Sequence, residues 1–184
     1  MNVIEFFNMY IKQDISAACW IAAAVLGAAM AAVFAVAVKR KKLSAGRAAA
    51  IWLLVIELFF LLSITVFSRE RSESAKYILT PFWSYKMIFD GSKYYIYEVV
   101  FNILMFVPIG ITLPFAAGKR LKFWQAVIFF AACSYTAELL QLILHAGIFE
   151  LVDDPLNNIA GGIIGFAAAA AIRAIVSLNG RNSA

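Results

Sequence analysis

Residues 15–38 read ISAACWIAAAVLGAAMAAVFAVAV, a stretch without a single charged residue. An α-helix needs about 20 apolar residues to cross the hydrocarbon core of a bilayer, so this stretch predicts a transmembrane helix. A cleaved signal peptide has a basic start and an apolar run of only about 7–15 residues. Here the run is longer, and the basic cluster Lys39–Lys42 follows it. We therefore expect a retained span.

Four further stretches have the same character along the rest of the chain. They are residues 48–67, 99–117, 123–144 and 156–176. The chain as a whole is 64% hydrophobic and 15% charged, whereas a soluble domain is about half apolar and a quarter charged. The sequence thus predicts an all-α, polytopic membrane bundle of about five transmembrane helices. Residues 1–14 mix aromatic and polar side chains and predict an interfacial N-terminal segment.

The distribution of basic residues predicts the orientation. Lys and Arg accumulate in cytoplasmic loops during insertion, which explains the net charge of +5 without a nucleic-acid partner. Basic residues cluster in the loop 39–47, in the loop 118–122 and near the C-terminus, while the loop 145–155 has none. This pattern places the N-terminus outside and the C-terminus inside. The loop 68–98 carries five basic residues and would be external, but long loops count less in this rule.

With this orientation, polar residues from five segments reach the outer membrane face. Glu138 and Gln141 are three residues apart and share one helical face, which His145 continues. Polar groups in lipid normally face the bundle interior or a water-filled cavity. The predicted polar cluster consists of Arg69, Asn102, Glu138, Gln141, Asp153, Asp154, Asn157 and Asn158.

Each member of this cluster also has a purely structural interpretation. Asp154 precedes a proline and suits a helix N-cap, which would leave Asp153 as the freer carboxylate. Glu138 and Gln141 could form an interhelical hydrogen-bond clasp, for example to Asn102. Carboxylates and asparagines could hold Mg²⁺ or Ca²⁺, yet no metal motif is recognisable and the single histidine excludes a histidine-rich metal site. No cofactor is identified.

Other residues predict packing rather than chemistry. Glu57 lies near the middle of the second span and is expected to pair with a polar group on a neighbouring span. Small residues recur every four positions at 161, 165 and 169, and again at 27, 31 and 35, which favours close helix approach. The segment Thr80–Tyr85 and the tyrosines that follow it favour the headgroup layer.

Several motifs in order resemble the VanZ-like family of bacterial membrane proteins. They are FSR at 67–69, TPFWSY at 80–85, NILMFVPIG at 102–110, ELLQ at 138–141, DD at 153–154, NN at 157–158 and GG at 161–162. The resemblance covers about residues 69–171. It implies that the family's characteristic polar residues are Arg69, Asn102, Glu138, Gln141, Asp153, Asp154 and Asn158. Two features depart from the family: Glu150 stands where a basic residue is expected, and the first span is additional to four-span relatives.

The resemblance implies a role in the bacterial cell envelope. The family's namesake is associated with low-level resistance to teicoplanin, a lipoglycopeptide, and limits how much drug reaches its cell-surface target. We therefore expect a multi-pass protein of the cytoplasmic membrane that alters the access of a lipoglycopeptide to its target. Membrane lipids, a lipid-linked cell-wall precursor or a lipoglycopeptide are its expected partners, and a homo-oligomer is compatible with the small-residue faces.

Two alternatives stay open at the level of sequence. One is an intramembrane enzyme acting on a lipid headgroup, with Glu138 or Asp153 as general base or metal ligand and Arg69 holding a phosphate. The other is a transporter or assembly factor, although no internal inverted repeat is visible. The expected organisation is residues 1–14 as interfacial segment, 15–47 as first span and basic loop, 48–177 as VanZ-like transmembrane domain, and 178–184 as cytoplasmic tail.

Overall fold

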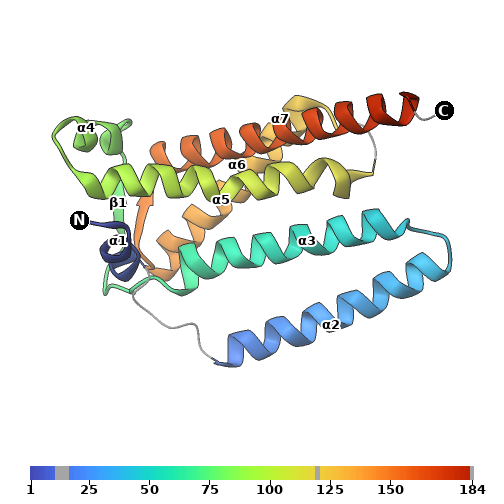
Figure 1. The fold of residues 1–184 in the computed structure, drawn as a ribbon. Coiled ribbons are helices and arrows are strands. Elements are labelled where there is room, and N and C mark those ends of the chain that lie inside the picture. The colour runs from blue at the N-terminus through green and yellow to red at the C-terminus, as the bar shows by residue number, and fades with distance from the viewer. Residues whose placement is uncertain (11–16, 119–120, 183–184) are drawn as a thin grey trace.

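The computed structural model describes residues 1–10, 17–118 and 121–182. The described residues form seven α-helices, a π-helical turn and two short strands (Figure 1). The long helices are α2 (Ala17–Lys39), α3 (Ala45–Leu62), α5 (Lys93–Ala117), α6 (Phe123–Leu144) and α7 (Asp153–Asn182). The short elements are α1 (Val3–Tyr10), η1 (Ser63–Phe67), β1 (Lys76–Ile78), α4 (Trp83–Phe89) and β2 (Ile148–Glu150).

The predicted all-α membrane architecture is confirmed. Four segments are long and apolar enough to cross a membrane: Ala45–Phe67, Lys93–Ala117, Phe123–Leu144 and Asp153–Asn179. In α2, the stretch Gly27–Lys39 forms a further, shorter apolar helix. The start of the expected first span, at residues 15–16, lies outside the described residues.

The helices α5 and α7 form the centre of the bundle, with α3 on one side and α6 on the other. Their contact is close because glycines line it. A Cβ atom on Gly161 would lie 2.0 Å from the carbonyl oxygen of Ile103, and one on Gly165 would lie 2.1 Å from that of Val107. Gly110 has the same relation to the backbone of α7, at 2.2 Å from Gly162 O. The predicted small-residue face on the last span is therefore a helix-packing face.

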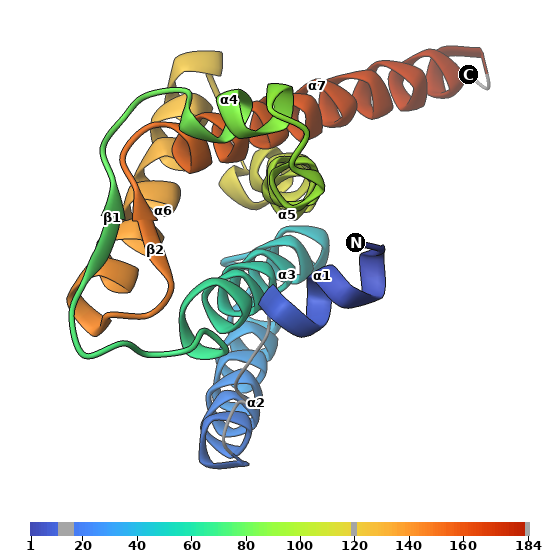
Figure 2. The same cartoon turned by 90° about the vertical axis from the view of Figure 1, so that its left-hand side faces the viewer.

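On the first span, no helix of the described chain packs closely on the small-residue face, so close helix approach there stays a prediction. Nothing lies within 4 Å of a Cβ atom placed on Gly27, and Ala31 and Ala35 are exposed. The helix α2 packs against α3 at the edge of the bundle, where Figure 2 shows it projecting away from the other helices. The indole nitrogen of Trp52 donates to the carbonyl oxygen of Gly27 at 3.3 Å. The side chain of Trp52 on α3 therefore contacts the backbone of α2.

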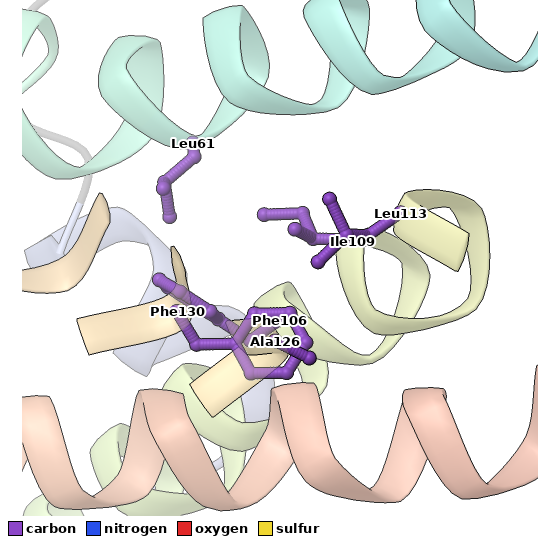
Figure 3. Packing of buried hydrophobic residues seen from close by; sticks show 6 residues of the cluster. All are labelled: Leu61, Phe106, Ile109, Leu113, Ala126 and Phe130. Atoms are coloured by element: carbon purple, nitrogen blue, oxygen red, sulfur yellow. The ribbon is translucent and has the colours of Figure 1, made fainter. Parts of the chain in front are cut away.

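The apolar core lies between α3, α5 and α6. Its buried residues are Leu61, Phe106, Ile109, Leu113, Ala126 and Phe130 (Figure 3). The side chain of Phe130 also lies against α7, since a Cβ atom on Gly162 would come within 2.5 Å of its ring. Aromatic rings thus fill the space that the glycines leave open beside the α5–α7 contact.

The end of the bundle that faces the viewer in Figure 2 is closed by the connecting segments. The strands β1 and β2 pair in parallel, with Tyr77 opposite Phe149. Nearby, the N–H of Ser72 donates to His145 O at 3.0 Å, and the N–H of Gly147 donates to Glu70 O at 3.2 Å. Backbone hydrogen bonds therefore hold the loop after η1 against the loop after α6.

The helix α1 lies at this same end. Its Phe6 side chain is 1% exposed and contacts the rings of Tyr94, Tyr97 and Phe101. Most of the other described side chains of α1 are exposed, so the helix presents one face to α5. Its predicted place at the membrane interface remains a prediction, and residues 11–14 of that segment lie outside the described residues.

Candidate functional site

A buried group of polar side chains lies under the β1–β2 pair and α4. We call it the polar network. It consists of Arg69, Ser84, Glu98, Asn102, Ser134, Glu138, Gln141, Glu150, Asp153, Asp154, Asn157 and Asn158. Every member except Arg69, which is partly buried, is at most 7% exposed. All eight residues of the predicted polar cluster belong to it.

Asp153 fixes the start of α4. Its Oδ1 accepts a hydrogen bond from the backbone N–H of Phe82, and its Oδ2 accepts one from that of Ser84, both at 2.7 Å. A helix start has unpaired N–H groups and a partial positive charge, so a carboxylate there is stabilising. The expectation that Asp153 is the freer carboxylate is therefore wrong. It is a cap, but for a helix 69 residues earlier in the chain.

Asp154 joins α7 to α5. The side-chain amide of Asn102 donates to Asp154 Oδ1, and both residues are buried. Asn102 was one possible partner for a clasp with Glu138 and Gln141, but its amide donates to Asp154. The contact lies where the glycine-lined helices α5 and α7 run side by side, so the short side chains of Asn and Asp can reach each other.

Glu138 and Gln141 point into the network from one face of α6, as their spacing predicts. Glu138 Oε2 accepts the backbone N–H of Glu150 at 2.8 Å and so holds β2. The Gln141 amide donates to the carbonyl oxygen of Thr65 in η1 at 2.9 Å. A π-helical turn disrupts the regular ladder of α-helical hydrogen bonds, and such turns occur frequently at functional sites.

Asn157 and Asn158 bind residues of two different neighbouring helices. Asn157 Oδ1 accepts a hydrogen bond from the hydroxyl of Tyr85 in α4. The Asn158 amide donates to Ser134 Oγ on α6 at 2.8 Å. The first two turns of α7 therefore connect α4, α5 and α6 through successive side chains.

The network combines one arginine with five carboxylates. Arg69 interacts electrostatically with Glu98, Glu138, Glu150 and Asp154, and its aliphatic part lies against Gly147. Because a buried charge is costly unless it is compensated, one cation among so many carboxylates favours proton uptake by some of them.

Glu150 lies outside the membrane-spanning segments, and its pKa is raised. Burial, followed by the charge of Asp154, raises its pKa to about 8, although the Ser84 hydroxyl donates to it at 3.1 Å and Arg69 also favours its charged form. The raised pKa favours the protonated form of this carboxyl at neutral pH. Burial, with the charges of Asp153 and Asp154, likewise raises the pKa of Tyr85.

Some of the network was not predicted from sequence. Glu98 precedes Asn102 by four residues and so lies on the same face of α5, a spacing that could have identified it. Ser84 and Ser134 carried no such signal, because their partners Glu150 and Asn158 are distant in the sequence. Glu150 was expected at the outer face, since it lies in the loop 145–155, and it also stood out as a departure from a family pattern.

Four polar atoms of the described network are buried and have no hydrogen-bond partner: Glu98 Oε2, Gln141 Oε1, Asn157 Nδ2 and Asn158 Oδ1. They are the atoms to which a water molecule or a small polar ligand could bind. Within residues 1–10, 17–118 and 121–182, no three His, Cys, Asp or Glu side chains are arranged to hold a metal ion.

Glu57 lies apart from the network. Its Oε1 accepts a hydrogen bond from the Thr112 hydroxyl on α5 at 2.9 Å. The predicted pairing with a polar group on a neighbouring span is confirmed.

Comparison with known proteins gives one match. The model of the family described as VanZ/LLP1 matches residues 47–173, which is more than half of the chain. No curated protein and no solved structure matches the chain.

Proposed function

The chain belongs to the VanZ/LLP1 family, and from this premise we propose that it lowers the access of a teicoplanin-like lipoglycopeptide to its target at the bacterial cell surface. The protein would act in the cytoplasmic membrane, with its N-terminus and the polar network at the outer face and its C-terminus inside. The distribution of basic residues supports this orientation, because they gather at the opposite end.

The observation that carries the proposal is what the polar network holds in place. Above it, the segment from β1 to α4 displays large apolar side chains on its outside. We call these the apolar cap: Tyr77, Leu79, Phe82 and Phe89, of which Phe89 is 90% exposed. Asp153 holds the backbone of Phe82 and Ser84, and Glu138 holds β2, which pairs with β1.

An apolar cap at the outer membrane face suits a ligand that has a lipid part. A lipoglycopeptide has an acyl chain that inserts at the outer leaflet, and a lipid-linked cell-wall precursor lies at the same depth. Each of the four side chains is more than half exposed, and large apolar groups exposed at a membrane face suit contact with lipid or a partner. The cap would compete for the drug, or shield the precursor, through apolar contacts.

The hydrogen bonds of the network favour a scaffold over a catalyst. Asp153 and Glu138, the two carboxylates first considered as general bases, accept hydrogen bonds from backbone N–H groups. A general base must instead be within reach of the reacting proton. The function therefore resides in the surface that the network supports.

The experiment compares fluorescent teicoplanin bound to intact cells with and without the full-length protein, with vancomycin as the second drug. Vancomycin binds the same kind of cell-wall target but has no acyl chain. A fall in bound teicoplanin with unchanged vancomycin supports the proposal. Equal binding of teicoplanin with and without the protein contradicts it.

One observation favours a second candidate, an enzyme acting on a lipid headgroup. Burial raises the pKa of Glu150 to about 8 beside Arg69, and a general acid or base works best with a pKa near the operating pH. Glu150→Gln separates the two functions. An enzyme that uses this carboxyl would lose turnover of its lipid, whereas drug exclusion by the cap would persist because an amide keeps an acceptor for Ser84.

A further inference from the structure

At the end of the bundle opposite the polar network, the charged side chains of the described residues are all basic. The sequence has no Asp or Glu in residues 15–56, 99–137 and 155–184, which supply this half of the long helices. The same ranges contain Lys39–Lys42, Arg47, Lys122 and Arg173. Arg47 has a structural role, since it donates to the carbonyl oxygens of Ala116 and Ala117 at 3.1 Å and so closes the end of α5.

A groove of about 750 Å³ lies at this end, between α5, α6 and α7. Its apolar wall consists of Pro114, Leu121, Phe123, Phe166 and Ala170. The charged residues that line it are Lys122 and Arg173, both exposed. The guanidinium of Arg173 lies 4.6 Å from the centre of the Phe115 ring, a cation–π contact that orients it.

The two cations lie at the depth of a lipid headgroup. Arg173 follows Asp153 by 20 residues on one helix, which at 1.5 Å per residue is about 30 Å, the thickness of the hydrocarbon core. Lys122 directly precedes α6. The apolar wall therefore extends from the headgroup layer toward the membrane interior.

We propose that this groove binds an anionic phospholipid, with its phosphate between Lys122 and Arg173 and an acyl chain along the apolar wall. Basic pockets between transmembrane helices on the cytoplasmic side bind such headgroups. A zwitterionic phospholipid also has a phosphate, but its own ammonium group adds a positive charge beside the two cations, so a lipid with net negative charge suits Lys122 and Arg173 better. A second copy of the chain in the same orientation would bring more positive charge to the same depth, so self-association here is unfavourable.

The test measures lipid binding to the purified full-length protein by native mass spectrometry in neutral detergent, with phosphatidylglycerol and phosphatidylcholine as probes. The protein is expected to prefer phosphatidylglycerol. The double variant Lys122→Gln/Arg173→Gln is expected to bind it about 30-fold more weakly, because each cation near an anionic headgroup contributes about fivefold in affinity.

The matched control is Arg40→Gln/Lys42→Gln, which removes the same charge from exposed positions on the loop after α2. It is expected to bind phosphatidylglycerol like the unmodified protein. An equal loss in both double variants would show diffuse attraction and overturn the site. Unchanged binding in Lys122→Gln/Arg173→Gln, or equal binding of the two lipids to the unmodified protein, would also overturn it.

A third variant tests the apolar part without changing charge. Ala170 is exposed in the groove, so Ala170→Trp fills it at little cost to folding. The variant is expected to bind phosphatidylglycerol several-fold more weakly.

Glycerol phosphate, which has the headgroup phosphate but no acyl chain, is expected not to bind. Unchanged lipid binding by Ala170→Trp, or tight binding of glycerol phosphate, would contradict the proposed lipid, and both results are independent of any effect on teicoplanin.

Discussion

Asp153 and Asp154 are neighbours in the sequence, yet their carboxylates stabilise different parts of the molecule. Asp153 accepts two backbone N–H groups at the start of α4, and Asp154 accepts the Asn102 amide on α5. A position near the helix start could predict that one of them is a cap. It could not predict which helix is capped, because that depends on how the loop between β1 and α5 folds back.

Replacing Asp153 with Asn should loosen α4. Asparagine has no charge, and its NH₂ group replaces one of the two oxygens that accept a backbone N–H. One buried N–H is then left without an acceptor, which costs about 1–3 kcal/mol of stability. Limited proteolysis of the purified protein should show faster cleavage in residues 79–91. Glu73→Gln, an exposed change in the same outer loop, is the control. Equal cleavage rates in both variants would refute the capping role.

Glu150 should make stability depend on pH. Its pKa is about 8 in the folded protein and near 4.5 when unfolded, so only the unfolded state loses this proton between these values. The free energy of unfolding therefore falls as pH rises through this window and then levels off. In Glu150→Gln this contribution is absent, so thermal unfolding in detergent from about pH 5 to pH 8 should change less. An identical pH profile in both proteins would contradict the raised pKa.

At the scale of elements, hydropathy predicted the long helices well because lipid imposes one simple requirement, a run of apolar residues. The three-residue strands β1 and β2 and the π-helical turn η1 left no periodic signal. The small-residue pattern predicted a close helix contact at Gly161 and Gly165, which α5 makes, but it could not identify the partner helix. At Gly27 the face is open in the described chain, so spacing alone shows that a helix can approach and not that one does.

Gly161→Ala should separate α5 from α7. The new Cβ would lie 2.0 Å from the carbonyl oxygen of Ile103, so the helices must move apart, at a typical cost of about 1–3 kcal/mol. Gly27→Ala places the same atom in open space and should be neutral or slightly stabilising. Thermal unfolding of both variants measures the difference, and a Gly161→Ala variant as stable as Gly27→Ala would show that the contact is not tight.

At the scale of the whole molecule, the chain has two chemically different ends. One holds the polar network beneath the apolar cap, and the other holds the basic loops and the groove with Lys122 and Arg173. The convergence of Arg69, Asn102, Glu138 and Asp153 at one end could be predicted from topology. Their individual partners could not, because Thr65 and Glu150 contribute backbone atoms that any residue has.

The charge difference between the ends predicts the topology in the membrane. In a background with Cys19 and Cys133 replaced by Ala, a cysteine at Ser74 should react with a membrane-impermeant maleimide on intact cells. A cysteine at Lys42 should react only after the cells are opened. The reverse pattern would place the polar network at the cytoplasmic face and would remove the basis for drug exclusion.

In the proposed function, the apolar cap, held by the polar network, limits teicoplanin binding. Phe89→Ser tests it most directly, because Phe89 is almost fully exposed and its loss should not affect folding. Fluorescent teicoplanin bound per cell is measured at equal protein levels, with Glu73→Gln as control and vancomycin for comparison. Phe89→Ser is expected to restore teicoplanin binding toward that of cells without the protein, with vancomycin unchanged. If cells with Phe89→Ser exclude teicoplanin as fully as cells with the unmodified protein, the cap is not the surface that acts.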